Sequence, residues 1–459
     1  MQLPEDFIRE TRLLMGSERF SRYMEAFDEE APVSIRLNPQ TLGDGSFLFD
    51  SLARNRCQTK KNRPQVFDNV PWCPEGYYLE GRPQFTFDPL FHAGCYYVQE
   101  AASMFITHIL RTILSPLTIP EQSSPTRSLS YLLPLTVLDL CAAPGGKSTA
   151  MLSVLPEGST LVSNEPIPNR AQILLENISK WRAPNCIVTN NYPRDFRKAK
   201  ARFDLILCDV PCSGEGMFRK DPATIGEWSQ QNVEKCWRLQ REIVADAWEC
   251  LNPGGILIYS TCTFNTKENE ENVRWIMEEY DAEPITIPTE PSWNITGSLL
   301  EGFDAPVYRF IPGITRSEGL FIAALKKREK WKEVIGLPLA TEGTQESGKR
   351  LPKRVQISKK SKLSAPIREL SAAEQFSFLF PLSSFHINLS YPEALKYLRG
   401  EALVLPADTP KGIVTVGYKG FPLGPVKNIG NRANNLYPKP WRIKTTHLPT
   451  EPVEIIYKL

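Results

Sequence analysis

The chain has 459 residues, of which 41% are hydrophobic and 23% charged, and its formal net charge is +2. This composition is typical of a folded globular protein with a large core, and the length favours about three domains. No apolar run reaches the roughly 18 residues that a membrane span requires. The first residues also lack the basic and apolar segments of a secretion signal, so we expect a cytoplasmic protein. Ten scattered cysteines without a Cys-x-x-Cys pair and four dispersed histidines predict reduced thiols and no metal site.

Residues 1–95 predict an N-terminal region of mixed α and β structure. Two short helices are expected over residues 4–27, with a break at Gly16. The alternating run at residues 33–37 predicts a strand. A loop-rich stretch is expected from there to about Phe91.

Residues 96–328 alternate between strand-like and helix-like runs, which predicts a mostly parallel, doubly wound α/β sheet. Strands are expected at residues 136–140, 161–163, 186–189, 203–208 and 255–259. Helices are expected at residues 99–113, 147–155, 169–181, 227–251 and 267–280. Residues 307–311 and 320–325 predict an antiparallel pair that closes the sheet. Residues 115–134, rich in Ser, Pro and Thr, look like an insertion or loop.

The last third of the chain is basic. Residues 326–459 hold 23 Lys and Arg against 11 Asp and Glu, a net charge of +12, so residues 1–325 carry −10. This is the electrostatic footprint expected for a polyanionic partner, and a solvated linker with lysines for solubility is the alternative. The polar residues 329–365 predict a linker. Strand-like runs at residues 402–405 and 413–418 predict a small β-rich domain over residues 366–459.

Chemically active side chains follow the predicted strands, and ligands of open α/β sheets bind outside the carboxyl ends of the strands. A turn from Asp139 to Lys147 follows the first strand, and its Gly145 and Gly146 permit close approach of a ligand. Glu165 lies about 20 residues beyond, where a carboxylate accepts hydrogen bonds from a ribose diol. The pattern fits S-adenosylmethionine and a dinucleotide equally well, and a tight turn without a ligand is the structural alternative.

Two thiols follow the fourth and fifth predicted strands, Cys212 in the run DVPC and Cys262 in STC. Two thiols beside a nucleotide-type pocket suggest covalent chemistry on a base. Carbon 5 of cytosine, for example, is too weak a nucleophile to attack a methyl sulfonium directly. Addition of a thiolate at carbon 6 makes carbon 5 enamine-like and therefore nucleophilic. Such chemistry needs a stabilised thiolate, an acid near N3 and a base for the carbon 5 proton, and Asp209 and the two thiols are of the right types. The residues alone leave the roles of the thiols interchangeable. Packing roles are expected for Cys57, Cys73, Cys95, Cys141, Cys186, Cys208, Cys236 and Cys250.

Taken together, these motifs closely resemble the Sun-type RNA (cytosine-5) methyltransferases. The resemblance covers about residues 1–328. It is carried by DLCAAPGGK at 139–147, NE at 164–165, NRA at 169–171, DVPCSGEG at 209–216, YSTCT at 259–263, SIRLN at 34–38 and SEGLF at 317–321. The C-terminal runs GYKGFPLG at 417–424 and YPKPWR at 437–442 look like the PUA-like tail of the bacterial RsmF-type rRNA members.

The resemblance implies a Rossmann-like class I methyltransferase fold with S-adenosylmethionine as its cofactor. It implies that Cys262 is the nucleophile and that Cys212 assists release of the methylated product. Cofactor contacts are implied for Cys141, Ala142, Ala143, Pro144, Gly145, Gly146, Lys147, Glu165 and Asp209, and Asp209 has a second implied contact, with the cytosine.

One position departs from the family pattern. The family usually has an aspartate after the third strand that contacts the adenine, and this chain has Tyr192 at that position, directly after Asn191. A hydrogen bond from Asn191 to the adenine and stacking of Tyr192 on it are the two alternatives.

The resulting hypothesis is methylation of carbon 5 of a cytosine in 16S rRNA or the 30S subunit, with the base flipped into the pocket. We expect a monomer without a metal or membrane partner. The N-terminal region and the PUA-like domain would hold the RNA backbone, with Arg36, Arg219 and Lys220 as candidate phosphate contacts. The alternatives are the same chemistry on tRNA and a non-catalytic RNA-binding assembly factor. The intact Cys212 and Cys262 argue against the assembly factor.

Overall fold

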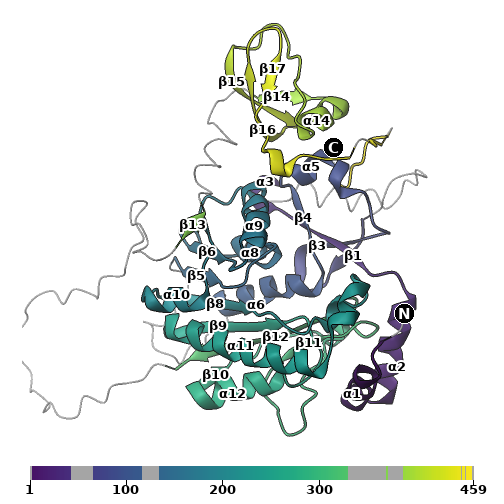
Figure 1. Cartoon of the computed structure of the whole chain (residues 1–459), viewed down its shortest axis with the longest axis vertical. Helices are drawn as coiled ribbons and strands as arrows, with labels where there is room; N and C mark the ends of the chain where they lie inside the picture. Colours follow the sequence, from purple (N-terminus) through teal and green to yellow (C-terminus); the bar gives the residue numbers. More distant parts are fainter. Residues whose placement is uncertain are drawn as a thin grey trace, which may run out of the picture.

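The computed structural model describes residues 3–42, 66–115, 134–328, 368–370, 386–445, 447–449 and 451–456. The predicted linker at residues 329–365, and residues 116–133 of the predicted insertion, lie outside these ranges. The described residues form an N-terminal sheet, a large central sheet and a small C-terminal sheet (Figure 1).

The central sheet has the doubly wound α/β architecture that the sequence predicts. Its strand order is β10-β12-β9-β8-β5-β6-β7-β13, and β11 pairs with β12. Neighbouring strands from β7 to β9 are parallel, whereas β10, β11, β12 and β13 pair antiparallel. The chain order reverses between β5 and β8, which in such sheets marks the ligand-binding edge. The strands are β5 (Thr136–Asp139), β6 (Thr160–Asn164), β7 (Cys186–Thr189), β8 (Phe203–Asp209), β9 (Leu251–Thr261), β10 (Ala282–Pro284), β11 (Tyr308–Phe310), β12 (Leu320–Lys327) and β13 (Glu369–Leu370).

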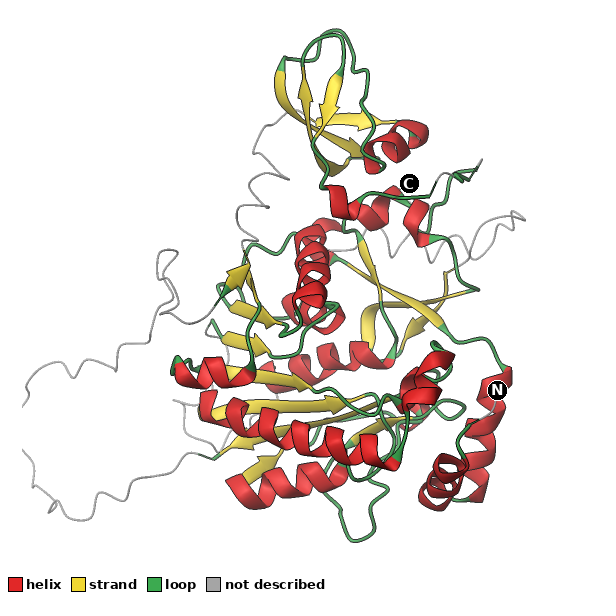
Figure 2. Ribbon diagram, viewed as in Figure 1, coloured by secondary structure: helices red, strands yellow, loops and turns green. Residues whose placement is uncertain are grey.

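Helices cover both faces of the central sheet (Figure 2). Side chains alternate along each strand, so that Val137 and Leu205 pack with α6, α8 and α9, while Leu138 and Ile206 pack with α10, α11 and α12. The helices are α6 (Phe105–Leu114), α8 (Gly146–Leu152), α9 (Pro168–Trp181), α10 (Pro193–Lys198), α11 (Gln230–Cys250) and α12 (Glu270–Tyr280). Among the described residues, no helix combines the length and the hydrophobicity needed to cross a membrane.

Local signals explain where the helices depart from the prediction. The helix expected over residues 99–113 begins at Phe105, because residues 96–98 form a strand and residues 102–104 a 3-10 turn. The helix expected over residues 227–251 begins after Ser229, whose side chain accepts a hydrogen bond from the Asn232 amide. The short helix α10 has no counterpart in the sequence prediction.

The N-terminal region contains both predicted helices, separated at Gly16, where φ is +74°. The strand predicted at residues 33–37 is also present, in a sheet of order β2-β3-β1-β4. The prediction of a loop-rich stretch was wrong for β2 and β3, since β3 pairs with β1 on one side and β2 on the other. The strand was missed because it contains Pro74 and Gly76 and its apolar and polar residues do not alternate. The elements are α1 (Glu5–Met15), α2 (Ser17–Glu25), β1 (Val33–Leu37), α3 (Pro39–Leu42), β2 (Val66–Val70), β3 (Cys73–Leu79), α5 (Pro89–His92) and β4 (Tyr96–Val98).

The C-terminal domain is small and built around a four-stranded sheet of order β14-β15-β16-β17. A strand at residues 402–405 was a wrong prediction, since only Leu403 forms an isolated bridge, to Ala433. The helix α14 was missed, although Ser390 and Glu393 form the capping box that marks its start. The elements are β14 (His386–Leu389), α14 (Tyr391–Leu398), β15 (Gly412–Tyr418), β16 (Phe421–Asn428) and β17 (Ala433–Asn435).

The N-terminal sheet and the C-terminal domain share one hydrophobic core. Ile35 and Tyr96 of the N-terminal sheet belong to the same buried cluster as Leu395 and Ile455 near the other end of the chain. The buried Asp88 receives hydrogen bonds from Tyr96 and from the Ile455 amide, and Tyr391 donates to the Phe87 carbonyl. The C-terminal domain therefore packs on the N-terminal region, mainly on the short helix α5 (Figure 1).

Candidate active site

The two predicted thiols meet at the carboxyl ends of β8 and β9. These strands are parallel, with Asp209 opposite Ser260, and the Val210 amide donates to the Ser260 carbonyl at 3.0 Å. The two loops therefore leave the sheet at the same level. The Cys212 and Cys262 sulfur atoms lie 3.3 Å apart, and both residues are half-buried. The structure thus brings together the thiols that the sequence placed on neighbouring strands.

The surroundings make the two thiols chemically unequal. The hydrogen bond with Cys212 lowers the pKa of Cys262 and outweighs burial and the Asp209 carboxylate, which both raise it, while the positive charge of Lys147 adds a smaller lowering. The same hydrogen bond and burial raise the pKa of Cys212. Cys262 is therefore the sulfur that carries a thiolate more readily, with the Cys212 thiol as its hydrogen-bond donor.

Asp209 and Lys147 connect the cofactor turn to the thiols. The Lys147 ammonium lies 2.8 Å from Asp209 Oδ2, and the Ser260 hydroxyl donates to Asp209 Oδ1 at 2.7 Å. Burial alone would lower the pKa of Lys147, but the Asp209 carboxylate raises it. A lysine held in its charged form beside Cys262 stabilises a negative sulfur.

Two buried carboxylates at the ends of β5 and β6 each keep one oxygen without a hydrogen bond in the described residues. Asp139 Oδ2 accepts from the Ser148 hydroxyl at 2.6 Å, whereas Oδ1 has no donor. Burial raises the pKa of Asp139 to about 7. Glu165 Oε1 accepts from the Ile167 amide, while Oε2 accepts none and has only the Arg170 guanidinium at 3.5 Å. Buried polar atoms are usually paired, so these oxygens fit a ligand with hydroxyl or ammonium groups. Sequence reasoning included Asp139 only as the start of the motif.

The turn at residues 141–147 is fixed mainly by its own main chain. The Ala142 amide donates to the Asn164 carbonyl at 2.7 Å, and the carbonyls of Ala143 and Pro144 accept from Arg170 and Asn177. Gly145 has a φ of +111°, a conformation that other residues rarely adopt. These contacts fix the turn next to Asp139 and Glu165, at the carboxyl ends of β5 and β6.

Asn191 is already engaged by another part of the chain. Its side-chain amide donates to the Arg368 carbonyl at 3.1 Å and accepts from the Arg368 amide at 2.9 Å, which extends the pairing of β13 with β7. Tyr192 is 56% exposed. The Asn191 hydrogen bond and the Tyr192 stacking on the adenine both stay predictions. Of the two side chains, that of Tyr192 is the one accessible to a ligand.

One predicted phosphate contact is wrong. Arg36 is fully buried, because its guanidinium lies 4.5 Å from the Trp181 ring and donates to Gln99, Ser153 and Thr149. It ties the N-terminal sheet to α8 and cannot reach RNA.

The other two candidate phosphate contacts differ from each other. Arg219 is largely occupied by Glu318 at 2.9 Å and by the Glu29 carbonyl at 3.2 Å, whereas Lys220 is exposed.

Within the described residues, no group of three His, Cys, Asp or Glu could hold a metal ion.

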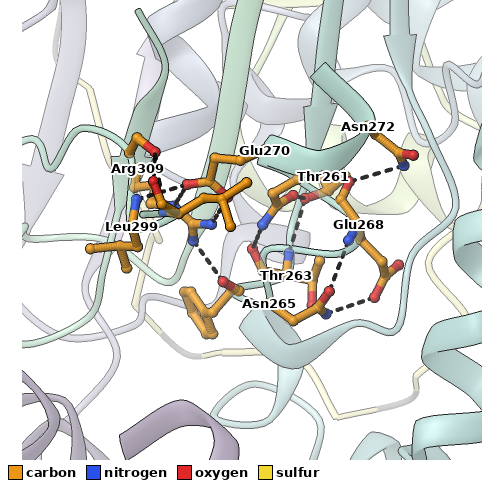
Figure 3. A network of polar contacts seen from close by, with 12 residues as sticks. Thr261, Thr263, Asn265, Glu268, Glu270, Asn272, Leu299 and Arg309 are labelled. Carbon is orange, nitrogen blue, oxygen red and sulfur yellow. Dashed lines mark hydrogen bonds and ion pairs between the residues drawn. The ribbon is translucent and has the colours of Figure 1, made fainter. Parts of the chain in front are cut away.

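The loop after β9 is anchored on its far side by a buried ion pair (Figure 3). Arg309 pairs with Glu270, with Nε 2.7 Å from Oε1, and Nη1 donates to the Phe264 carbonyl at 2.7 Å. Glu270 also accepts from the Leu299 amide. The Cys262 loop is thereby fixed to the strands that close the sheet, a contact that no motif indicated.

Family models match three parts of the chain. Residues 134–326 match the model of the 16S rRNA methyltransferase RsmB/F, and residues 3–101 match the N-terminal domain of 16S rRNA methyltransferase RsmF. Residues 384–443 match the methyltransferase RsmF PUA domain. In all three parts the chain is similar to the RsmB/F methyltransferases. The three RsmB/F matches coincide with the central sheet, the N-terminal region and the C-terminal domain described above.

RsmB/F relatives include two proteins named ribosomal RNA small subunit methyltransferase F. The protein from Enterobacter sp. (strain 638) is 28% identical over 487 residues, which cover 95% of each chain. The protein from Pectobacterium atrosepticum is 31% identical over 338 residues, or 71% of this chain. That match spans only 63% of the Pectobacterium protein's own length.

Solved structures of similar fold come from Pyrococcus horikoshii. A methyltransferase homologue protein is 25% identical, with a TM-score of 0.53, and the match covers 71% of this chain and 100% of that one. NSun6, solved with SFG, is 19% identical, with a TM-score of 0.54 and coverage of 71% and 99%. The second likeness supports the RsmB/F fold alone.

Proposed function

We propose that this chain is an S-adenosylmethionine-dependent RNA methyltransferase that acts on carbon 5 of a cytosine in 16S rRNA. The observation that carries the proposal is the 3.3 Å contact between Cys212 and Cys262 beside the Lys147–Asp209 pair. Two thiols with opposite pKa shifts suit a reaction that first forms and then breaks a carbon–sulfur bond. The names of the relatives favour small-subunit rRNA over tRNA.

In the attack step, the Cys262 thiolate adds to carbon 6 of the flipped cytosine. The Cys212 thiol and the Lys147 ammonium stabilise that thiolate before attack. Asp209, held by Lys147 and Ser260, is assigned to the polar edge of the base. S-adenosylmethionine, when bound, supplies an electrophilic methyl group to carbon 5. The buried oxygens of Glu165 and Asp139 and the turn at residues 141–147 would hold it, with Glu165 on the ribose diol.

In the release step, a solvent water takes the proton from carbon 5, and the carbon 5–carbon 6 double bond forms again. The electron pair of the carbon–sulfur bond returns to Cys262 as a thiolate. Cys212 lies 3.3 Å from that sulfur, so it is placed next to the bond that breaks. We assign Cys212 to this release, because its thiol can donate a hydrogen bond to the departing sulfur.

Transfer of a labelled methyl group tests the proposal directly. Purified protein is incubated with labelled S-adenosylmethionine and unmodified 30S subunits, 16S rRNA or tRNA. We expect 5-methylcytosine in the ribosomal samples, and bisulfite mapping of RNA from a deletion strain would locate it. Transfer to tRNA alone would contradict the substrate. Cofactor binding without transfer to any RNA would contradict the activity and favour an assembly factor.

A further inference from the structure

Each of the two loops that carry the thiols is held by a buried carboxylate of the other loop. We define the β8 loop as residues 210–216 and the β9 loop as residues 262–269. Each loop carries one buried glutamate downstream of its cysteine, Glu215 in the first and Glu268 in the second. Each of these side chains accepts hydrogen bonds from main-chain amides of the opposite loop. We call Glu215 and Glu268 the carboxylate clasp.

Glu268 holds the β8 loop. Its Oε2 accepts from the Ser213 amide at 3.0 Å and from the Gln240 side chain at 2.6 Å. Its Oε1 accepts from the Asn265 side chain at 2.8 Å (Figure 3). Ser213 directly follows Cys212, so this carboxylate fixes the main chain next to that thiol.

Glu215 holds the β9 loop in the reciprocal way. Its Oε2 accepts from the amides of Phe264 at 2.6 Å and Asn265 at 3.1 Å. Its Oε1 accepts from Trp228 Nε1 and from the Asn265 side chain, both at 3.0 Å. Phe264 lies two residues after Cys262, so the second thiol is fixed from the first loop.

Direct contacts between the loops show how close the approach is. The hydroxyls of Ser213 and Thr263, the residues that follow the two cysteines, lie 2.8 Å apart. The Gly216 amide donates to the Cys262 carbonyl at 2.7 Å, and a Cβ at Gly216 would lie only 2.6 Å from that oxygen. The loops therefore touch through main chain as well as through the clasp.

Stability alone is a weak reason for this arrangement. Burial of a carboxylate opposes folding, and well-packed apolar residues often replace buried charges without loss of stability. Both clasp residues nevertheless direct acceptors to amides within two residues of the opposite thiol. We propose that Glu215 and Glu268 are positioning residues that hold Cys212 and Cys262 in contact, so that one enzyme conformation serves both attack and release. This inference rests on the proposed function.

The distance between the thiols can be tested without RNA. Phenylarsine oxide bridges two adjacent thiols by forming two arsenic–sulfur bonds with loss of water, and Cys212→Ala provides the blank. We expect Glu268→Gln and Glu215→Gln each to slow the bridging by about tenfold or more, since displacement by 1 Å strongly penalises reactions that need two aligned groups. The matched control is Asp88→Asn, which alters another buried carboxylate with three hydrogen bonds, far from the thiols. Bridging at the wild-type rate in both clasp variants would overturn the proposal.

A milder variant covers the case in which a glutamate variant does not fold. Gln240→Met keeps the length of the side chain but removes its hydrogen bonds to Glu268 and the Pro211 carbonyl, and those it accepts from Tyr259 and Asn272. We expect slower bridging, by a smaller factor than in the glutamate variants, in a protein with a wild-type circular dichroism spectrum. Unchanged bridging in a folded Gln240→Met protein would contradict the clasp.

The fate of the RNA adduct separates positioning from mere stability. Glu268→Gln frees the loop of Cys212, so a denaturant-resistant RNA adduct should accumulate. Glu215→Gln frees the loop of Cys262, so adduct formation itself should fall, with KM for RNA unchanged in both variants. Equal loss of turnover in both, without any change in adduct, would show a structural role only. If wild-type protein and Cys212→Ala form neither product nor adduct, the proposed function fails, and the bridging rates still decide the clasp.

Discussion

Two buried polar regions of this molecule contrast with each other. At the junction between the N-terminal sheet and the C-terminal domain, Asp88 receives donors on both oxygens, from Leu90, Tyr96 and Ile455. At the carboxyl edge of the central sheet, Asp139 and Glu165 each keep an oxygen without a donor in the described residues. Asp88 is therefore saturated by donors of the protein itself, whereas Asp139 and Glu165 can each accept a further hydrogen bond. The unpaired oxygens, together with their place beside the switch point of the sheet, favour Asp139 and Glu165 as ligand contacts and Asp88 as a structural residue.

The largest effect is expected at the thiols of the binding edge. Cys262→Ala should lower methyl transfer by on the order of 10⁴-fold or more, as removal of a nucleophile does in other enzymes. Transfer is measured with labelled S-adenosylmethionine and rRNA. Cys236→Ala, which changes a half-buried cysteine on α11, is the control and should keep its activity. Retained activity in Cys262→Ala would exclude it as the nucleophile.

Cys212→Ala should stop turnover at a later stage than Cys262→Ala. The carbon–sulfur bond would still form, but its release would lack the neighbouring thiol 3.3 Å away. A protein–RNA adduct that survives denaturing electrophoresis should therefore accumulate in Cys212→Ala and not in Cys262→Ala. The opposite pattern would exchange the roles of the two cysteines.

A smaller effect is expected at the cofactor carboxylate. Glu165→Gln keeps the size of the side chain and one oxygen for the Ile167 amide, but it loses the charged acceptor. Hydrogen bonds to charged groups contribute about 1.5–3 kcal/mol, so the Kd for S-adenosylmethionine should rise by about tenfold or more. Calorimetric titration measures this change, with the melting temperature as a control for folding. An unchanged Kd would contradict the contact between Glu165 and the ribose of the cofactor.

The smallest effect on activity is expected at the junction. Asp88→Asn should lower the free energy of unfolding by about 1–3 kcal/mol, because it disturbs buried hydrogen bonds. Methyl transfer per folded molecule should stay at the wild-type value. A specific loss of transfer in this variant would break the contrast between the two regions.

The pH dependence of stability offers a second test of the junction. Burial raises the pKa of Asp88 from 3.8 to about 6, so the folded state binds a proton more tightly than the unfolded state does. The contribution of Asp88 to the free energy of unfolding should therefore grow as the pH falls from about 6 toward 4. Denaturant unfolding of wild-type protein and Asp88→Asn over this range measures the difference. Parallel curves for the two proteins would contradict the shift.

The carboxyl edge of the sheet was predictable from the sequence because each of its parts is local. Strand-like runs followed by Asp139, Glu165, Asp209, Cys212 and Cys262 are read within a few residues, and parallel strands bring such ends together. The burial of Arg36 was not predictable in this way, since its partners Thr149 and Ser153 lie more than 110 residues away.

The carboxylate clasp lay beyond sequence reasoning for a related reason. Glu215 and Glu268 stand in polar runs that resemble exposed loops, and only the pairing of β8 with β9 turns them toward each other's main chain. The docking of Ile455 on Asp88 depends on residues separated by 367 positions. Such contacts follow from the closed fold and not from any local pattern.

The core shared by Ile35 and Leu395 has a consequence for how the polypeptide is made. The N-terminal sheet leaves the ribosome long before α14 does, and at typical rates of synthesis the interval is on the order of tens of seconds. During that time the sheet can pack only on nearby residues such as Phe85 and Leu90, and the part of the core that the C-terminal domain covers stays exposed. The protein cannot complete its fold from the N-terminus onward, and a nascent chain stalled before α14 should be bound by chaperones.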